Sequence, residues 1–336
     1  MIRFGTIGVV FLCLCIFMVL MPVSASAKPL MEDVPSGFDV LIAREGVKLY
    51  RKEYPSGNPD YVQVINLDQG AHIALLHGDI QESRSGEGVY GGDDPTMLVK
   101  KLEKYWQEVS VDKSAVCVTN GQFFFMPEYP TRLPFPLKVN GSIISDGFGK
   151  QLYQGDKLIL ELWPDRANIS GLTKEALYQS SAPNIIAGLT EDARKSPTKY
   201  VGRTFVGVDD RNRDGRYETV LIFSTKSARQ KDAAGVLREF GAEKVMMLDG
   251  GGSAQLICQG DAYVSSDRPL PQVMAIFEGN GGKPFDGGFL GTGHAVLEMG
   301  KGGEVNLFDT IWIPLAMSPF FLVLFIFIRN KTFGYE

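Results

Sequence analysis

An aspartate followed by three glycines and a serine, within "KVMMLDGGGSAQLIC", is the segment best suited to chemistry. The apolar run before it predicts a buried strand that ends at Asp249. Gly250, Gly251 and Gly252 then turn the chain, and successive amides in such a turn can form an anion-binding nest. The Asp249 carboxyl can act beside that anion as an acid, a base or a nucleophile. A glycine-rich hairpin with an exposed aspartate is the alternative interpretation. The spacing is that of neither a P-loop nor a dinucleotide fingerprint.

Two further segments place polar residues at the ends of predicted strands. The run "AVCVTNGQFFFMPEYP" ends a strand at Asn120 and Gly121, and Phe123 follows directly. Phe123 can wall a pocket or stack on a sugar face, or it can be a core aromatic. In "YVGRTFVGVDD", Arg203 begins another apolar strand. It is either a surface residue or a bidentate clamp for a phosphate.

In their order along the chain, "TNGQFF", "GRTFVGVD", a helix and "MLDGGGSAQLI" resemble the phosphodiester glycosidase family. The resemblance covers roughly residues 60 to 278. It implies cleavage of a glycosyl phosphodiester, with the catalytic residues Asp249, Asn120 and Arg203. It also implies substrate contacts from Gly121, Gly250, Gly251, Gly252 and Ser253. The aromatic character of Phe123 adds that residue to the expected substrate contacts.

The chain departs from the family pattern at two positions. Gln122 stands where the family has a second glycine, and Met247 replaces the asparagine before Leu-Asp. A glutamine side chain near the site implies a different choice of substrate. Glycoside cleavage also requires a second carboxyl in most mechanisms, for which Asp146 and Glu128 are candidates.

A polar loop, "DDRNRDGRYE", has the spacing of a calcium loop at Asp210, Asn212 and Asp214. Its twelfth position is Leu221, so the bidentate glutamate of an EF-hand is missing. The loop is either a hairpin turn or a structural Ca²⁺ clip. No other cofactor and no catalytic metal are expected.

Strand patterns outnumber helix patterns in the middle of the chain. Periodicity predicts helices over 94–109 and 227–240. It predicts strands at "VQVINLD", "HIALLHG", "AVCVTNG", "LILELW", "TFVGVDD", "ETVLIFST", "KVMMLDG", "SAQLIC" and "PQVMAIFEG". Because helices and strands do not alternate regularly, we expect an α+β domain with a mixed β-sheet core and flanking helices.

Both ends of the 336-residue chain differ from its middle. The pattern predicts a signal peptide (1–27), a phosphodiester glycosidase-like domain (28–278), a glycine-rich stalk (279–307), a transmembrane helix (308–329) and a cytoplasmic tail (330–336). Cys117 and Cys258 are the cysteines left in the domain, as either one bridge or two buried thiols. A net charge of −5 without a basic run makes nucleic acid a poor partner.

The sequence therefore predicts an extracytoplasmic hydrolase of sugar-1-phosphodiesters, tethered to a membrane by its C-terminal helix. Its partners are a glycan or sugar phosphate and the membrane, and we expect a place in surface glycan or exopolysaccharide metabolism. A non-catalytic glycan or cell-wall binding module that uses the same pocket is the alternative.

Overall fold

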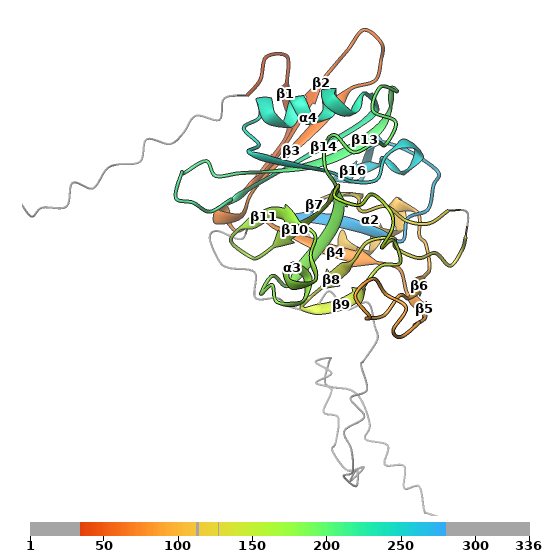
Figure 1. The fold of residues 1–336 in the computed structure, drawn as a ribbon. Helices are drawn as coiled ribbons and strands as arrows, with labels where there is room; N and C mark the ends of the chain where they lie inside the picture. Colours follow the sequence, from red (N-terminus) through yellow and green to blue (C-terminus); the bar gives the residue numbers. More distant parts are fainter. Residues whose placement is uncertain (1–33, 112–113, 127, 280–336) are drawn as a thin grey trace, which may run out of the picture. The chain divides into compact units, whose positions relative to one another are not determined.

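The computed structural model describes residues 34–279 except 112, 113 and 127, which Figure 1 shows in colour. The predicted signal peptide (1–27), transmembrane helix (308–329) and tail (330–336) lie outside the described residues, as does the stalk beyond Gly279. Within the described ranges, no helix is long and apolar enough to cross a membrane.

Eleven strands form the larger sheet (Figure 1). Its path runs β1-β2-β3-β14-β13-β15-β12-β10-β11, and β8 pairs with both β12 and β9. The strands are β1 (Asp39–Arg44), β2 (Val47–Lys52), β3 (Asp60–Asn66), β8 (Leu137–Val139), β9 (Ser142–Ser145), β10 (Lys157–Leu162), β11 (Ala167–Gly171), β12 (Asn184–Leu189), β13 (Val201–Asp209), β14 (Thr219–Ala228) and β15 (Lys244–Met247).

A second sheet of five strands has the order β17-β16-β7-β18-β4. These strands are β4 (His72–His77), β7 (Ala115–Asn120), β16 (Leu256–Cys258), β17 (Asp261–Val264) and β18 (Gln272–Phe277). A separate two-stranded ribbon joins β5 (Ile80–Glu82) and β6 (Thr96–Met97). All nine predicted strands are present.

The α+β class is confirmed, but the prediction of a mixed sheet is wrong. Every strand pair in the described part of the chain is antiparallel. Parallel neighbours need a long crossover, usually a helix, whereas antiparallel strands can follow each other through short turns. Here β1, β2 and β3 are joined in that direct way, as are β10 and β11, and β13 and β14.

The helices of the described residues are short: α2 (Leu102–Val109), α3 (Lys174–Tyr178) and α4 (Gln230–Glu239), with 3₁₀ turns η1 (Leu67–Gln69) and η2 (Gly251–Ser253). The prediction over 227–240 is confirmed by α4, and Gly241 follows it with a φ of 104°. The helix predicted from residue 94 begins only at Leu102. Asp94 pairs with Arg132 at 2.8 Å instead of capping, and β6 occupies the intervening stretch. Tertiary pairing overrides the local helix signal there.

Three apolar clusters show how these elements are layered. The first lies between the two sheets and takes side chains from both, among them Val206, Ile222, Cys117, Met274 and Ile276. The second packs α4 on the outer face of the larger sheet, with Phe205, Phe223, Leu237 and Phe240. The third packs α2 on the outer face of the smaller sheet, with Leu102, Tyr105, Val273 and Phe277. Neighbouring Phe205 and Val206 face opposite layers because side chains alternate along a strand.

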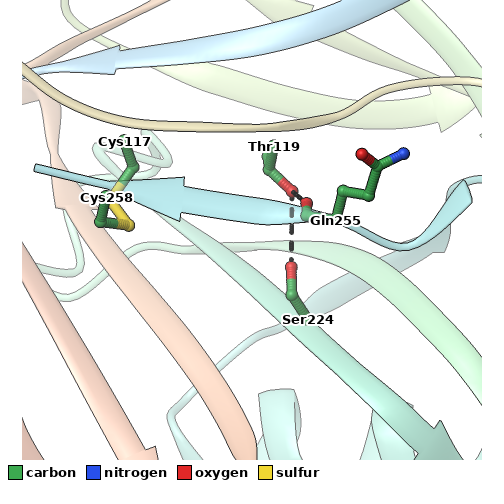
Figure 2. The surroundings of a disulfide bond; sticks show 5 residues. All are labelled: Cys117, Thr119, Ser224, Gln255 and Cys258. Atoms are coloured by element: carbon green, nitrogen blue, oxygen red, sulfur yellow. Dashed lines mark hydrogen bonds between the residues drawn. A yellow bond between two sulfur atoms is a disulfide. The ribbon is translucent and has the colours of Figure 1, made fainter. Parts of the chain in front are cut away.

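A disulfide within the smaller sheet and a polar contact between the two sheets lie along β7. Cys117 and Cys258 face each other in register and are bridged, with an S–S distance of 2.07 Å. Figure 2 shows that Thr119 donates through its hydroxyl to the Gln255 carbonyl at 2.9 Å. The same hydroxyl lies 3.5 Å from Ser224 Oγ, on β14 of the larger sheet. The two sheets are therefore joined by polar atoms one residue before Asn120.

Candidate active site at the glycine turn

β15 leads through Leu248 into the glycine turn, where two of the three predicted segments meet. The Asp249 amide donates to the Gly121 carbonyl at 3.2 Å. The Asp249 carbonyl accepts from Asn120 Nδ2 at 2.8 Å. The end of β7 thus bonds to both the amide and the carbonyl of Asp249. These bonds fix the backbone position from which the Asp249 side chain projects.

Asn120 is the hub of this arrangement. Its Oδ1 accepts from the Thr204 hydroxyl at 2.7 Å and from the Gln255 amide at 3.1 Å. Its Nδ2 donates to the carbonyls of Asp249 and, at 3.4 Å, Gly121. All four hydrogen-bonding positions of the amide are used within the protein. Asn120 is only 1 % exposed, so it holds the site together rather than touching a substrate.

The glycines allow the backbones around this hub to touch. A Cβ on Gly250 would lie 2.5 Å from the Gly202 carbonyl oxygen, at the start of β13. A Cβ on Gly121 would lie 1.6 Å from Gln272 Oε1. A larger residue at 250 would push the turn away from β13, and one at 121 would displace the Gln272 side chain.

Asp249 is a half-buried residue, and its carboxyl sits in a hydrogen-bonded network. Its Oδ1 accepts from the Gly250 amide at 2.9 Å, and the Ser253 hydroxyl also bonds to it. Arg268 Nη1 donates to Ser253 Oγ at 3.0 Å. Burial raises the pKa of Asp249 above its ordinary value. The two hydrogen bonds and the charges of Lys195 and Arg268 lower this pKa, but they do not outweigh the burial.

Lys195 approaches this carboxyl from the loop between β12 and β13. Its ammonium group lies over the rings of Phe123, at 5.1 Å, and Tyr153, at 5.6 Å. Phe123 is 6 % exposed and packs edge-on against Phe135. With one face under the lysine, Phe123 supports a cation and has little surface left to stack on a sugar.

Arg203 does not form the expected phosphate clamp. Its Nε donates to the Ala228 carbonyl at 3.2 Å, and its Nη1 to the Lys195 carbonyl at 3.1 Å and to Met247 Sδ at 3.9 Å. Its Nη2 donates to the carbonyls of Ser196, at 2.6 Å, and Lys199, at 3.3 Å. All five N–H groups are used, so none remains for a phosphate.

The expected amide nest is smaller than the sequence indicates. The Gly250 amide donates to the Asp249 carboxylate, and the Ser253 amide donates to the Gly250 carbonyl at 3.0 Å. The amides of Gly251 and Gly252 form the first turn of η2 and have no acceptor among the residues that the structure describes. Two amides, a carboxylate and two cations thus converge at the turn.

The model of the phosphodiester glycosidase family matches residues 113–277, which include the whole turn and its hub. Residues 113–277 belong to the phosphodiester glycosidase family. No curated protein sequence matches this chain.

Two solved structures are similar to this phosphodiester glycosidase region and its surroundings. One is the catalytic domain of zebrafish N-acetylglucosamine-1-phosphodiester alpha-N-acetylglucosaminidase, auto-inhibited by its propeptide. It is 12% identical with a TM-score of 0.47, over 72% of this chain and 88% of the other. The second is a hypothetical protein from Synechocystis, 11% identical with a TM-score of 0.46, over 73% of this chain and 64% of the other.

Neither candidate second carboxyl of the phosphodiester glycosidase domain bonds to the glycine turn within the part of the chain that the structure describes. Asp146 is fully buried, and its Oδ2 accepts from the amides of Tyr90, at 2.7 Å, and Gly92, at 2.9 Å. It therefore holds the loop before β6. Glu128 is exposed. In the described ranges, neither carboxylate bonds to a residue of the glycine turn.

Gln122, the first departure from the family pattern, turns away from the carboxyl. Its Nε2 donates to the Pro136 carbonyl at 3.4 Å, and its amide donates to Gln272 Oε1 at 3.0 Å. The residue is 2 % exposed, so it acts on the pocket through Gln272 rather than by its own side chain.

The calcium-like loop closes on its own backbone. Asp210 accepts from the amides of Asp214, at 3.1 Å, and Gly215, at 2.8 Å, while Asp214 Oδ1 accepts from the Arg216 amide at 2.9 Å. Asn212 Oδ1 also accepts from the Asp214 amide. The oxygens expected to hold Ca²⁺ therefore stabilise a hairpin turn. Nowhere in the described residues do three His, Cys, Asp or Glu side chains gather as a metal site requires.

An open cavity of about 310 Å³ lies apart from the turn, beside α2. It is lined by Arg44, Trp106, Ser110, Ala115, Val116, Gln259 and Glu278. Its guanidinium and its carboxylate face each other at 3.9 Å, and no residue of the phosphodiester glycosidase motifs reaches it. The glycine turn is therefore the candidate active site.

Sequence reasoning missed three residues of the site: Lys195, Arg268 and Gln272. The first two lie in polar loops, and nothing local distinguishes them among the 34 lysines and arginines of the chain. Gln272 begins a strand that the sequence does predict. Its proximity to Gly121 depends on the antiparallel pairing of β7 and β18, which local pattern does not reveal.

A matched pair of alanine variants should separate the roles of two neighbouring glycines. Gly252→Ala places a Cβ 2.8 Å from the Arg268 guanidinium carbon and displaces it from Ser253. We expect KM to rise roughly 10-fold with little loss of stability, because the end of a flexible side chain can move.

Gly251→Ala serves as the counterpart, since its φ is +60° and open space surrounds the new methyl group. It should lower the free energy of unfolding by about 1–2 kcal/mol through backbone strain and leave KM close to native. Steady-state kinetics and thermal melts on both variants check this contrast. Equal effects of the two substitutions on KM would contradict it.

Proposed function

We propose that the described domain is a hydrolase that cleaves the bond between the anomeric carbon of a sugar and a phosphodiester oxygen. The observation that carries the proposal is the Asp249 carboxyl, held by Ser253 and Gly250 and lying within the electrostatic influence of Lys195 and Arg268. The match of residues 113–277 to the phosphodiester glycosidase family supports the same reaction.

The charge change in this reaction suits two cations. Water and the diester, which carries one negative charge, give a free sugar and a phosphate monoester that carries up to two. The monoester dianion has a conjugate acid with a pKa of about 6, so it leaves with little help from a proton donor. Since negative charge grows on the leaving group, Lys195 and Arg268 stabilise the transition state more than the bound substrate.

Asp249 acts in its ionised form, either as the nucleophile at the anomeric carbon or as the base that takes a proton from water. Three glycines follow the carboxylate, so the turn adds no bulky side chain of its own beside it. Ser253 and the Gly250 amide orient the carboxylate, and Asn120 fixes the backbone from which it projects.

Lys195→Met should lower kcat as well as raise KM, because it removes charge stabilisation that increases along the reaction. We expect kcat/KM to fall roughly 10- to 100-fold. Methionine keeps the length and the apolar stem over Phe123 and Tyr153. Lys226→Met, at an exposed position on β14, is the control for loss of one positive charge. Equal kinetics for the two variants would remove Lys195 from the site.

The deciding experiment is an assay of residues 28–307 against a panel of sugar-1-phosphodiesters that differ in sugar and aglycone. Release of reducing sugar together with phosphate monoester supports the proposal. Saturable binding without release would favour the glycan-binding module instead.

The cellular setting is part of the proposal. The domain acts on the extracytoplasmic side of a membrane, tethered by the segment 308–329, on a surface glycan or exopolysaccharide. The residue patterns at both ends support this, and the Cys117–Cys258 disulfide fits an oxidising compartment. Release of the full-length chain from membranes by alkaline carbonate would contradict the tether.

A further inference from the structure

Arg203 makes most of its hydrogen bonds to the loop between β12 and β13. Three of its five N–H groups bond to the carbonyls of Lys195, Ser196 and Lys199. The guanidinium thus lies beneath the loop between β12 and β13 and replaces the backbone partners that these carbonyls would have in a strand. The side chain itself is 3 % exposed and rooted in β13.

The held segment carries a cation of the candidate site. Lys195 is exposed, and its ammonium group lies over Phe123 and Tyr153 while its charge lowers the pKa of Asp249. Gln230 is a second tether: its Nε2 donates to the carbonyls of Glu191 and Ala193, both at 2.7 Å, and its backbone amide donates to the Pro197 carbonyl at 3.2 Å. Arg203 is therefore the tether that bonds to the backbone of Lys195 itself.

We propose that Arg203 is a positioning residue that acts through Lys195 by fixing the backbone of the segment 195–199. The inference rests on the proposed function, since it assigns how one anion-binding group of that site is held in place. An arginine suits the task because its five donors lie in a rigid plane. A lysine at 203 has three donors and cannot satisfy the same acceptors.

A double-mutant cycle on Arg203→Lys and Lys195→Met tests the dependence. Arg203→Lys alone should lower kcat/KM roughly 10-fold, through kcat as well as KM as for Lys195→Met, although the positive charge is retained. Once Lys195 is methionine, Arg203→Lys should lower kcat/KM almost no further. The effects of two substitutions are not additive when one residue acts through the other. If the fold reductions in kcat/KM of the two single variants multiply in the double variant, the inference is wrong.

Tryptic cleavage gives a readout that needs no activity. Arg203→Lys keeps the number of tryptic sites, yet it should speed cleavage after Lys195 and Lys199 several-fold by releasing their carbonyls. Val208→Ala is the control: it creates a cavity in buried β13 and lowers global stability without touching the loop. If the control speeds these cleavages as much as Arg203→Lys at equal Tm loss, the loop-holding role is wrong.

The two proposals fail in distinguishable ways. If the wild-type domain hydrolyses no phosphodiester, the proposed function fails, and the cycle is then measured on the Kd for inorganic phosphate by calorimetry. Non-additive Kd values with fast loop cleavage still support the role of Arg203. Additive Kd values overturn it.

Discussion

Asp249→Asn is expected to fold normally and to lose turnover by at least about 100-fold, the smallest effect typical of an acid–base group. Asparagine keeps the size of the side chain and an oxygen for Ser253 and the Gly250 amide, but it cannot ionise. Steady-state rates on a cleaved diester measure the loss, and circular dichroism checks the fold. Asp210→Asn, in the hairpin turn that closes on its own amides, is the matched control and should keep native rates.

The pH dependence of Asp249 has a definite sign. Burial raises the pKa of the folded carboxyl above the ordinary value of about 3.9, and only the ionised form is active in the proposed reaction. The acid limb of kcat/KM should therefore rise through a pKa higher than that of an ordinary aspartate. This limb should be absent from the residual activity of Asp249→Asn. A limb at or below the ordinary value would contradict the role of this carboxyl.

The same raised pKa has a consequence for stability. A group whose pKa is higher in the folded state stabilises the fold below its unfolded pKa and loses that contribution as pH rises through the folded pKa. At neutral pH the ionised Asp249 is thus unfavourable, so Asp249→Asn should melt at the wild-type temperature or above it. The difference should vanish in acid, where the wild-type carboxyl is protonated in both states. A lower Tm for the variant at pH 7 would mean that the carboxylate's hydrogen bonds outweigh its burial.

Loss of the disulfide should have the largest effect on stability. The bridge joins cysteines 141 residues apart, and the chain-entropy model assigns a loop of that length up to about 5 kcal/mol. We expect Cys117→Ala combined with Cys258→Ala to reduce the free energy of unfolding by roughly 3–5 kcal/mol. For a domain of this size, that corresponds to a fall in Tm of roughly 6–20 °C. Calorimetry on the double variant measures it.

Either single alanine variant is the control for the disulfide, because it removes the bridge and leaves one buried thiol. Its Tm should be close to that of the double variant. Activity at low temperature should persist in all three proteins, since β7 and β16 remain paired through their backbones. An unchanged Tm would show that the unfolded chain is already restricted without the bridge.

The strands of this fold are more visible in the sequence than their pairing. Runs such as "HIALLHG" and "PQVMAIFEG" are apolar enough to predict β4 and β18, but no local signal shows that these two strands pair with each other. The antiparallel sheets follow from contacts between distant segments. The helix predicted over 94–109 is present only from Leu102 for the same reason, since the Asp94–Arg132 ion pair is non-local.

The candidate site shows the same division. Asp249 and the glycines are visible because the composition of their turn is unusual, and the structure places Asn120 against them. Arg203 is visible too, but its sequence position suggests contact with a ligand, whereas its hydrogen bonds end on loop carbonyls. Lys195 has no signature at all. The position of its backbone depends on a hydrogen bond from the Arg203 side chain, several residues later in the sequence.

The strand order of the smaller sheet bears on how the protein is made. β4 and β7 leave the ribosome early, yet β18 is the neighbour of both, and β16 covers the other edge of β7. Until Gln272 and the residues after it are synthesised, the apolar strands β4 and β7 have unpaired edges. Such edges are templates for aggregation and for chaperone binding. The glycine turn and Gln272, which both bond to the end of β7, are also synthesised late. The residues that complete the site are therefore synthesised together with the strands that close the smaller sheet, and we expect no active intermediate before both are made.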